Sequence, residues 1–169
     1  KEYATVANMI GFTPIHDTEP SRLLRMGLEP QNFLGAKTFH QRLSNAGIAS
    51  YVLIKNDFKN SPLSQMFYQG AKRVHGFVNS SDMFVSLTRL VKSDPNERAC
   101  ILVYWDAIDS ISHVYGANSE AFAAEVRNLS YSLEHEFIRN VDSQISGTTL
   151  LMLIADHGQV TVPESKLVR

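Results

Sequence analysis

Two short segments of the sequence combine carboxylate and imidazole side chains at spacings that could hold a metal ion. In "WDAIDSISHVYG", Asp109 and His113 are four residues apart, which lets both side chains converge if the segment forms a helical turn or a compact loop. In "ADHGQ", Asp156 and His157 are adjacent, and Gly158 permits a turn that can bring both to one edge. Carboxylate oxygen and imidazole nitrogen suit Zn²⁺ and are acceptable to Mn²⁺ or Fe²⁺. These four residues are therefore the candidate metal ligands.

Each segment directly follows an apolar run that predicts a buried β-strand. Residues 99–104 ("ACILVY") precede the first segment, and residues 149–155 ("TLLMLIA") precede the second. Two more strands are predicted at residues 4–12 and 48–54. Ligands of open parallel sheets bind beyond the carboxyl ends of the strands. We therefore expect both polar segments to meet at one edge of the sheet.

Amphipathic helices are predicted between these strands. The helix at residues 38–46 has a clear start, because Thr38 and Gln41 have the spacing of a capping box. The longest helix is predicted from residue 118 or 119 to about residue 140. Shorter helices are predicted after Ser21, after Ser61 and after Ser80 or Ser81.

The alternation of apolar strands with amphipathic helices predicts an α/β fold, with a mostly parallel sheet and helices on both faces. At about 150 residues per domain, residues 1–169 are expected to form a single α/β domain. The irregular stretches before residue 38 and around residues 56–79 are expected to be loops or lids.

The composition excludes several classes of function. The 169 residues contain 16 Lys and Arg against 17 Asp and Glu, which gives a formal net charge of -1. This balance provides neither the basic surface of a nucleic-acid-binding protein nor a polybasic membrane arm. Apolar runs such as residues 150–155 are far shorter than the ~18 residues of a membrane span. The single cysteine, Cys100, permits no internal disulfide, and the cellular compartment stays open.

Four stretches of the chain resemble type I phosphodiesterases and nucleotide pyrophosphatases, which are members of the alkaline phosphatase superfamily. "YWDAIDSISHVYG" resembles the family's "PDxxGHxxGP" stretch, and "LLMLIADHGQV" resembles its "SDHGM" segment. "EYATVANMIGFTP" and "TFHQRLSNAGIASYVLI" resemble the family's opening region and one of its helix-strand units. Ile108 and Ser112 stand where the family usually has Pro and Gly, and neither position is a ligand. The resemblance covers essentially the whole chain and implies part of an alkaline phosphatase-like core.

The resemblance implies a site with two divalent metal ions, with zinc favoured and manganese as the alternative. Asp109 and His113 would hold one ion, and Asp156 and His157 would hold the other. Two cations about 4 Å apart stabilise the attacking and leaving oxygens of phosphoryl transfer and lower the pKa of the nucleophile. The implied activity is hydrolysis of a phosphodiester, a pyrophosphate or a related phosphoester, with a small-molecule phosphoester or nucleotide as substrate.

The resemblance also implies that parts of the site lie outside this chain. The family's Thr or Ser nucleophile is expected before residue 1, and a third His ligand is expected after residue 169. The chain is therefore expected to be a central fragment of a catalytic domain, without a catalytic residue of its own, inactive in isolation and weak in metal binding.

Other assignments remain open at this point. Asp106 could replace Asp109 as a ligand, while Thr13 and Ser110 are expected to form turns or loop hydrogen bonds and not to be nucleophiles. In a different reading, the chain is a non-catalytic α/β binding or structural module whose four candidate ligands only make turns and hydrogen bonds. Relatives with the same two-metal plan also act on phosphonates, sulfate esters or phosphosugars.

Overall fold

The computed structural model describes residues 7–8, 11–14, 21–94 and 96–160. Its internal contacts divide the chain into two compact units. The first unit comprises residues 1–77 and 97–104, and the second comprises residues 78–96 and 105–169. The expectation that the chain forms a single domain stays a prediction.

The first unit contains a parallel three-stranded sheet in the order β4-β3-β5. The central strand β3 (Ala49–Lys55) pairs in parallel with β4 (Arg73–Phe77) and with β5 (Ala99–Val103). The apolar side chains of β3 are buried, as expected for a strand with neighbours on both sides. The predictions of strands at 48–54 and 99–104 are confirmed, and so is the α/β class with a parallel sheet.

Strand β4 lies where the sequence predicted a loop and a short helix, so this part of the prediction is wrong. The strand contains Arg73, His75 and Gly76, which interrupt the apolar pattern that marks a buried strand. As an edge strand, β4 pairs only with β3 among the described residues. An edge strand needs less apolar character than a central one, so its periodicity is weak in the sequence.

Short helices of the first unit contact this sheet or come soon after its central strand in the sequence. Helix α2 (Phe39–Asn45) contacts β3 and begins with the predicted capping box, in which Thr38 accepts from the Gln41 N–H and Gln41 accepts from the Thr38 N–H. Helix α3 (Asn56–Lys59) contacts β3 and β4. Helix α4 (Pro62–Phe67) starts at the predicted cap, Ser61.

The amino-terminal part of the first unit contains a separate, very small sheet. Strand β1 (Ala7–Asn8) pairs antiparallel with β2 (Thr13–Pro14), and neither joins the parallel sheet. The predicted strand at 4–12 was therefore wrong as a member of the parallel sheet, and residues 4–6 and 9–10 lie outside the described residues. Helix α1 (Arg22–Arg25) and the 3-10 turn η1 (Pro30–Asn32) follow. A small core gathers here from Phe12, Leu23 and Met66.

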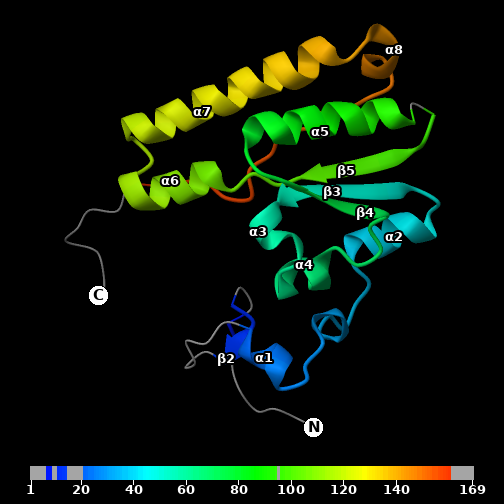
Figure 1. The fold of residues 1–169 in the computed structure, drawn as a ribbon, viewed down its shortest axis with the longest axis vertical. Helices are drawn as coiled ribbons and strands as arrows, with labels where there is room; N and C mark the ends of the chain where they lie inside the picture. The colour runs from blue at the N-terminus through cyan, green and yellow to red at the C-terminus, as the bar shows by residue number, and fades with distance from the viewer. Residues whose placement is uncertain (1–6, 9–10, 15–20, 95, 161–169) are drawn as a thin grey trace. The chain divides into compact units, whose positions relative to one another are not determined.

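All regular secondary structure among the described residues of the second unit is helical. Helix α5 (Ser80–Ser93) lies beside α7 (Glu120–Ser132), and α6 (Ala107–Tyr115) also contacts α7 (Figure 1). Helix α7 continues through a π-helical turn, η2 (Leu133–Phe137), and a 3-10 turn, η3 (Ile138–Asn140), so the predicted extent to residue 140 is confirmed. The short helix α8 (Ser143–Ser146) follows. None of the helices formed by the described residues has the length and apolar character of a membrane-spanning helix.

Two details of the second unit explain where its helices begin and bend. The cap of α5 is Asn79, which accepts from the Asp82 N–H, and not Ser80 or Ser81 as predicted. The Glu136 carbonyl in the π-helical turn accepts a 2.6 Å hydrogen bond from the Thr88 hydroxyl on α5. This bond connects the turn to α5.

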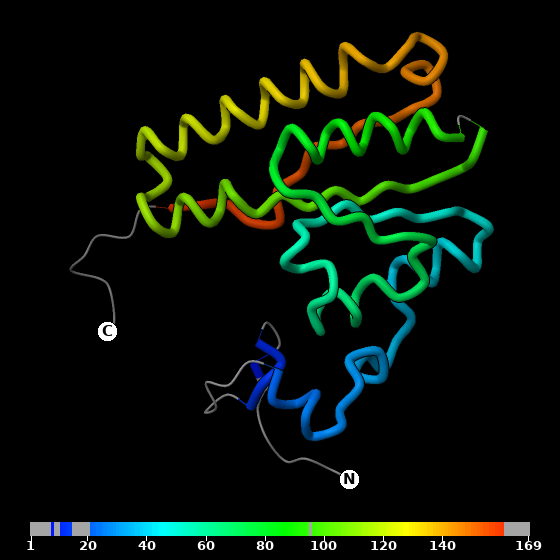
Figure 2. The backbone as a smooth tube through the Cα atoms, in the orientation of Figure 1, coloured from blue at the N-terminus to red at the C-terminus, as the bar shows by residue number. Residues whose placement is uncertain are grey.

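The predicted fourth strand at residues 149–155 is wrong. Residues 149–155 form no strand, and the chain after α8 runs as an extended segment without a helical turn (Figure 2). Leu150, Leu153 and Ile154 are about four-fifths exposed, at 83%, 80% and 79%. An apolar run forms a strand only when a neighbouring strand accepts its backbone hydrogen bonds, and within the described residues no strand pairs with this run.

Candidate metal centre

Helix α6 positions the first pair of candidate ligands. Asp109 and His113 lie one turn apart on it, with 3.5 Å between Asp109 Oδ2 and His113 Nε2. The start of the helix is held at α7, because the Trp105 indole N–H donates to Glu125 at 2.9 Å. The helix ends at Gly116, whose φ of 86° is favourable for glycine. The predicted helical spacing of the first motif is therefore present in the structure.

The second pair of candidate ligands lies next to the first. The chain bends at Asp156 and His157, and His157 Nε2 lies 3.8 Å from Asp156 Oδ1. The same nitrogen lies 3.8 Å from Asp109 Oδ1, so the two motifs meet. All four residues belong to the second unit. The expected convergence of the two segments is observed, although residues 149–155 reach it as an extended chain and not as a strand.

This cluster is open to solvent. The side chains of Asp156 and His113 are 78% and 77% exposed, and that of Asp109 is 42% exposed. The pKa of His157 is raised, first by the Gly158 carbonyl at 3.0 Å from Nδ1 and then by the carboxylates of Asp156 and Asp109. These neighbours favour the protonated imidazole of His157. A metal ion that binds Nε2 therefore has to displace the proton on that nitrogen.

The separations between these donor atoms agree with pairs of ligands on a shared ion. Two atoms bound at about 2.1 Å to a tetrahedral zinc ion lie about 3.4 Å apart. The pair Asp109 and His113 is separated by 3.5 Å, and the pair Asp156 and His157 by 3.8 Å. However, over residues 7–8, 11–14, 21–94 and 96–160, no group of three or more His, Cys, Asp or Glu side chains is arranged to hold a metal ion. The described residues thus fit metal binding in pairs and do not form a complete ligand set.

Sequence reasoning missed one residue of the cluster. Gln159 donates from Nε2 to Asp109 Oδ1 at 3.2 Å. Its position two residues after His157 was visible in the sequence, but a glutamine carries no signal of metal chemistry. The alternative ligand Asp106 occupies the cap position of α6 and makes no capping hydrogen bond with its side chain. Its role as an alternative ligand stays a prediction.

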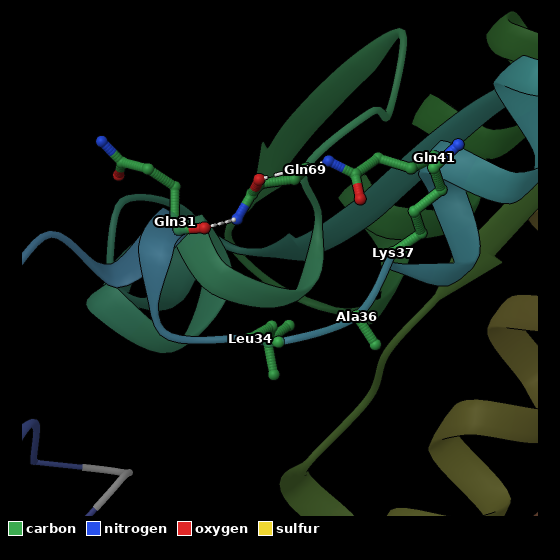
Figure 3. Close-up of a pocket in the computed structure, with 7 residues that line it drawn as sticks. Gln31, Leu34, Ala36, Lys37, Gln41 and Gln69 are labelled. Atoms are coloured by element: carbon green, nitrogen blue, oxygen red, sulfur yellow. Dashed lines mark hydrogen bonds between the residues drawn. The ribbon is translucent and has the colours of Figure 1, made fainter.

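A pocket in the first unit is lined by residue types that differ from those of the Asp and His cluster. Its volume is about 280 Å³, and Figure 3 shows the residues that line it. Its lining consists of amide, aliphatic and lysine side chains together with one glycine: Gln31, Leu34, Gly35, Ala36, Lys37, Gln41 and Gln69. The amide of Gln69 is already engaged, because it donates to the Gln31 carbonyl at 2.8 Å. The lining includes neither a carboxylate nor an imidazole, so metal chemistry is not expected there.

Fold and site together define an α/β protein in which two Asp and two His side chains converge at an exposed position. The sequence model of the type I phosphodiesterase / nucleotide pyrophosphatase family matches residues 11–169, and the chain belongs to this family. Neither the curated proteins nor the solved structures include a match to the chain. Membership agrees with an alkaline phosphatase-like α/β core. It supports hydrolysis of the phosphodiesterase or pyrophosphatase type at the level of the family, whose substrates are small phosphoesters and nucleotides.

Proposed function

We propose that the protein containing this chain hydrolyses phosphodiester or pyrophosphate bonds in small phosphoesters or nucleotides with the help of two divalent cations. Asp109 and His113 are the proposed ligands of one ion, and Asp156 and His157 those of the other. One observation carries the assignment: His157 Nε2 lies 3.8 Å from Asp109 Oδ1, which unites two motifs that are far apart in sequence. The family match over residues 11–169 supports the reaction type.

The proposed role of these residues is to hold two cations at the place where a phosphoryl group reacts. When bound, the two ions would polarise the phosphoryl oxygens and lower the pKa of the attacking group. Asp109 has a central place in this plan, because Oδ2 faces His113 and Oδ1 faces His157. A carboxylate between two imidazoles supplies the negative charge that offsets repulsion between neighbouring cations. The mixed oxygen and nitrogen donors favour zinc, with manganese as the alternative.

Each pair supplies only two ligands, and a stable site needs more. We propose that residues outside 1–169 supply the nucleophile and a further His, as the resemblance implies. On this proposal the isolated chain is inactive and binds metal weakly, because the number of ligands governs affinity.

The test is a substitution of Asp156 in the full protein, outside the helix that carries the other pair. Asp156→Ala is expected to lower kcat/KM for a bis-nitrophenyl phosphodiester at least about 100-fold, equivalent to about 2.7 kcal/mol, and to reduce the bound metal measured by elemental analysis. Asp57→Ala removes an exposed carboxylate from α3 and is the matched control, with activity and metal content unchanged. Full activity of Asp156→Ala would contradict the assignment.

A non-catalytic module is the second candidate, and it is favoured by the lack of a three-ligand group among the described residues. The two readings differ in one assay. A metal-loaded full protein that cleaves neither phosphodiesters, phosphonates nor sulfate esters would support the module. Cleavage of one of the latter two classes in place of phosphodiesters would assign a different substrate to the same site.

A further inference from the structure

We propose that Gln159 is a positioning residue that fixes the carboxylate of Asp109 for metal binding. The inference rests on the proposed function, because it concerns the same pair of ions. Its first support is direct: Gln159 Nε2 donates to Asp109 Oδ1 at 3.2 Å. This is the carboxylate oxygen that also faces His157 Nε2 at 3.8 Å.

The chemistry of the two groups determines how the amide is oriented. An ionised carboxylate only accepts hydrogen bonds, whereas an amide donates through nitrogen and accepts through oxygen. Exchanging the two ends of the Gln159 amide would place two acceptors against each other, so the nitrogen faces Asp109. The amide oxygen, Oε1, is buried and accepts no hydrogen bond within the described part of the chain. The hydrogen bond to Asp109 is therefore the interaction that fixes the orientation of the Gln159 amide.

A neutral donor suits a carboxylate that has to bind a cation. Lys or Arg at this position would hold Asp109 equally well but would offset its negative charge and repel the ion. The amide donates to Oδ1 and leaves Oδ2 available to a cation. Oδ2 lies 3.5 Å from His113 Nε2. The side chain of Asp109 is 42% exposed and is free to adopt other rotamers without such a contact. Hydrogen bonds of this kind orient the ligands of metal sites.

Gln159 also connects the two motifs physically. It lies two residues after His157, on a segment whose preceding residues 149–155 belong to no strand. Asp109 lies on α6. The hydrogen bond between them therefore restrains the segment that carries Asp156 and His157 relative to the helix that carries the first pair. Its loss is expected to weaken both pairs, although Gln159 binds no metal itself.

The experiment is calorimetric titration of the metal-free full protein with Zn²⁺ alone. Gln159→Leu keeps the branched shape of the side chain and removes its donor, and we expect binding to weaken about 10- to 100-fold, the usual effect of losing such a partner. Gln144→Leu makes the same change at an exposed position of α8 and should leave Zn²⁺ affinity unchanged. Thermal unfolding of each variant checks that the fold is retained.

A double-mutant cycle with Asp109→Asn separates positioning from a general structural effect. If Gln159 acts through Asp109, Gln159→Leu has no further effect on Zn²⁺ affinity in the Asp109→Asn background. Equal weakening in both backgrounds would overturn the positioning role. Full Zn²⁺ affinity in Gln159→Leu, together with loss in Asp109→Asn, would overturn it and leave the proposed function intact. Full affinity in Asp109→Asn would overturn both.

Discussion

Two apolar segments of the chain have similar composition and opposite environments. In strand β3 of the first unit, Val52, Leu53 and Ile54 are buried, with exposed fractions of 0%, 1% and 4%. In the second unit, residues 150–154 are five consecutive apolar residues, yet Leu153 is 80% exposed. Apolar character alone therefore does not determine which run becomes a strand.

The difference lies in the partners of the backbone. Strand β3 has parallel neighbours on both sides, β4 and β5, which satisfy its N–H and C=O groups. Burial of a backbone without such partners costs about 1–3 kcal/mol for each unsatisfied group. Residues 149–155 pair with no strand in the described part of the chain, and their backbone stays accessible to water. Pairing is thus the condition for burial.

The comparison predicts very different costs for the same substitution in the two segments. Leu53→Ala removes buried contacts from β3 and leaves a cavity, so we expect it to lower the free energy of unfolding by about 2–5 kcal/mol. Leu153→Ala removes an exposed side chain and should change it by less than about 0.5 kcal/mol. Urea denaturation followed by circular dichroism measures both. A loss of more than about 2 kcal/mol in Leu153→Ala would mean that residues 150–154 are buried in solution.

Sequence predictions succeeded where the interactions behind them are local in sequence and failed where they are between residues far apart in sequence. The start of α2 was predictable because Thr38 and Gln41 are three residues apart and satisfy each other. Strand β4 was missed because it depends on pairing with β3, and its own residues, with His75 and Gly76 among them, carry little strand signal. The strand prediction at 149–155 failed for the converse reason, since this strongly apolar run pairs with no strand among the described residues.

Two glycines with the same φ sharpen the contrast between the units. Gly70 and Gly116 both have a φ of 86°, which costs an L-residue about 1–2 kcal/mol. A Cβ at Gly70 would lie 2.7 Å from backbone atoms of Gln41, whereas a Cβ at Gly116 would meet no atom of the described residues within 4 Å. Gly70→Ala is therefore expected to lower the free energy of unfolding by about 3 kcal/mol or more, and Gly116→Ala by about 1–2 kcal/mol. Equal losses in denaturant titrations would show that the contact with Gln41 relaxes without cost.

The candidate site was predictable in the same uneven way. The approach of His113 to Asp109 is local, because four residues make one helical turn, and the structure has it. The approach of His157 was expected from a shared sheet edge, but it occurs between a helix and an extended segment. The contact of Gln159 could not be predicted, since an amide with no charge and no periodicity is distinguished only by what it touches.

The smallest expected effect concerns a buried histidine of the first unit. His40 on α2 is 2% exposed, lies edge-on to the rings of Phe39 and Tyr68, and has an unpartnered Nδ1 among the described residues. Burial lowers the pKa of His40 below its ordinary value of 6.5. Burial, and secondarily Tyr104, raises the pKa of the Tyr68 phenol, so that neighbour stays neutral near pH 6.

The direction of the pH effect follows from these states. Below about pH 6.5 the unfolded chain binds a proton at His40, while the folded chain keeps the imidazole neutral until its lowered pKa is reached. The free energy of unfolding therefore falls as the pH falls through this window, by at most about 1.4 kcal/mol per pH unit. His40→Phe retains a ring and cannot titrate, so the variant should lose less stability than the native chain between pH 7.5 and pH 5.5, with a difference of at most about 1.4 kcal/mol per pH unit. Parallel curves for the two proteins in urea titrations at each pH would show that His40 is solvated and titrates alike in both states.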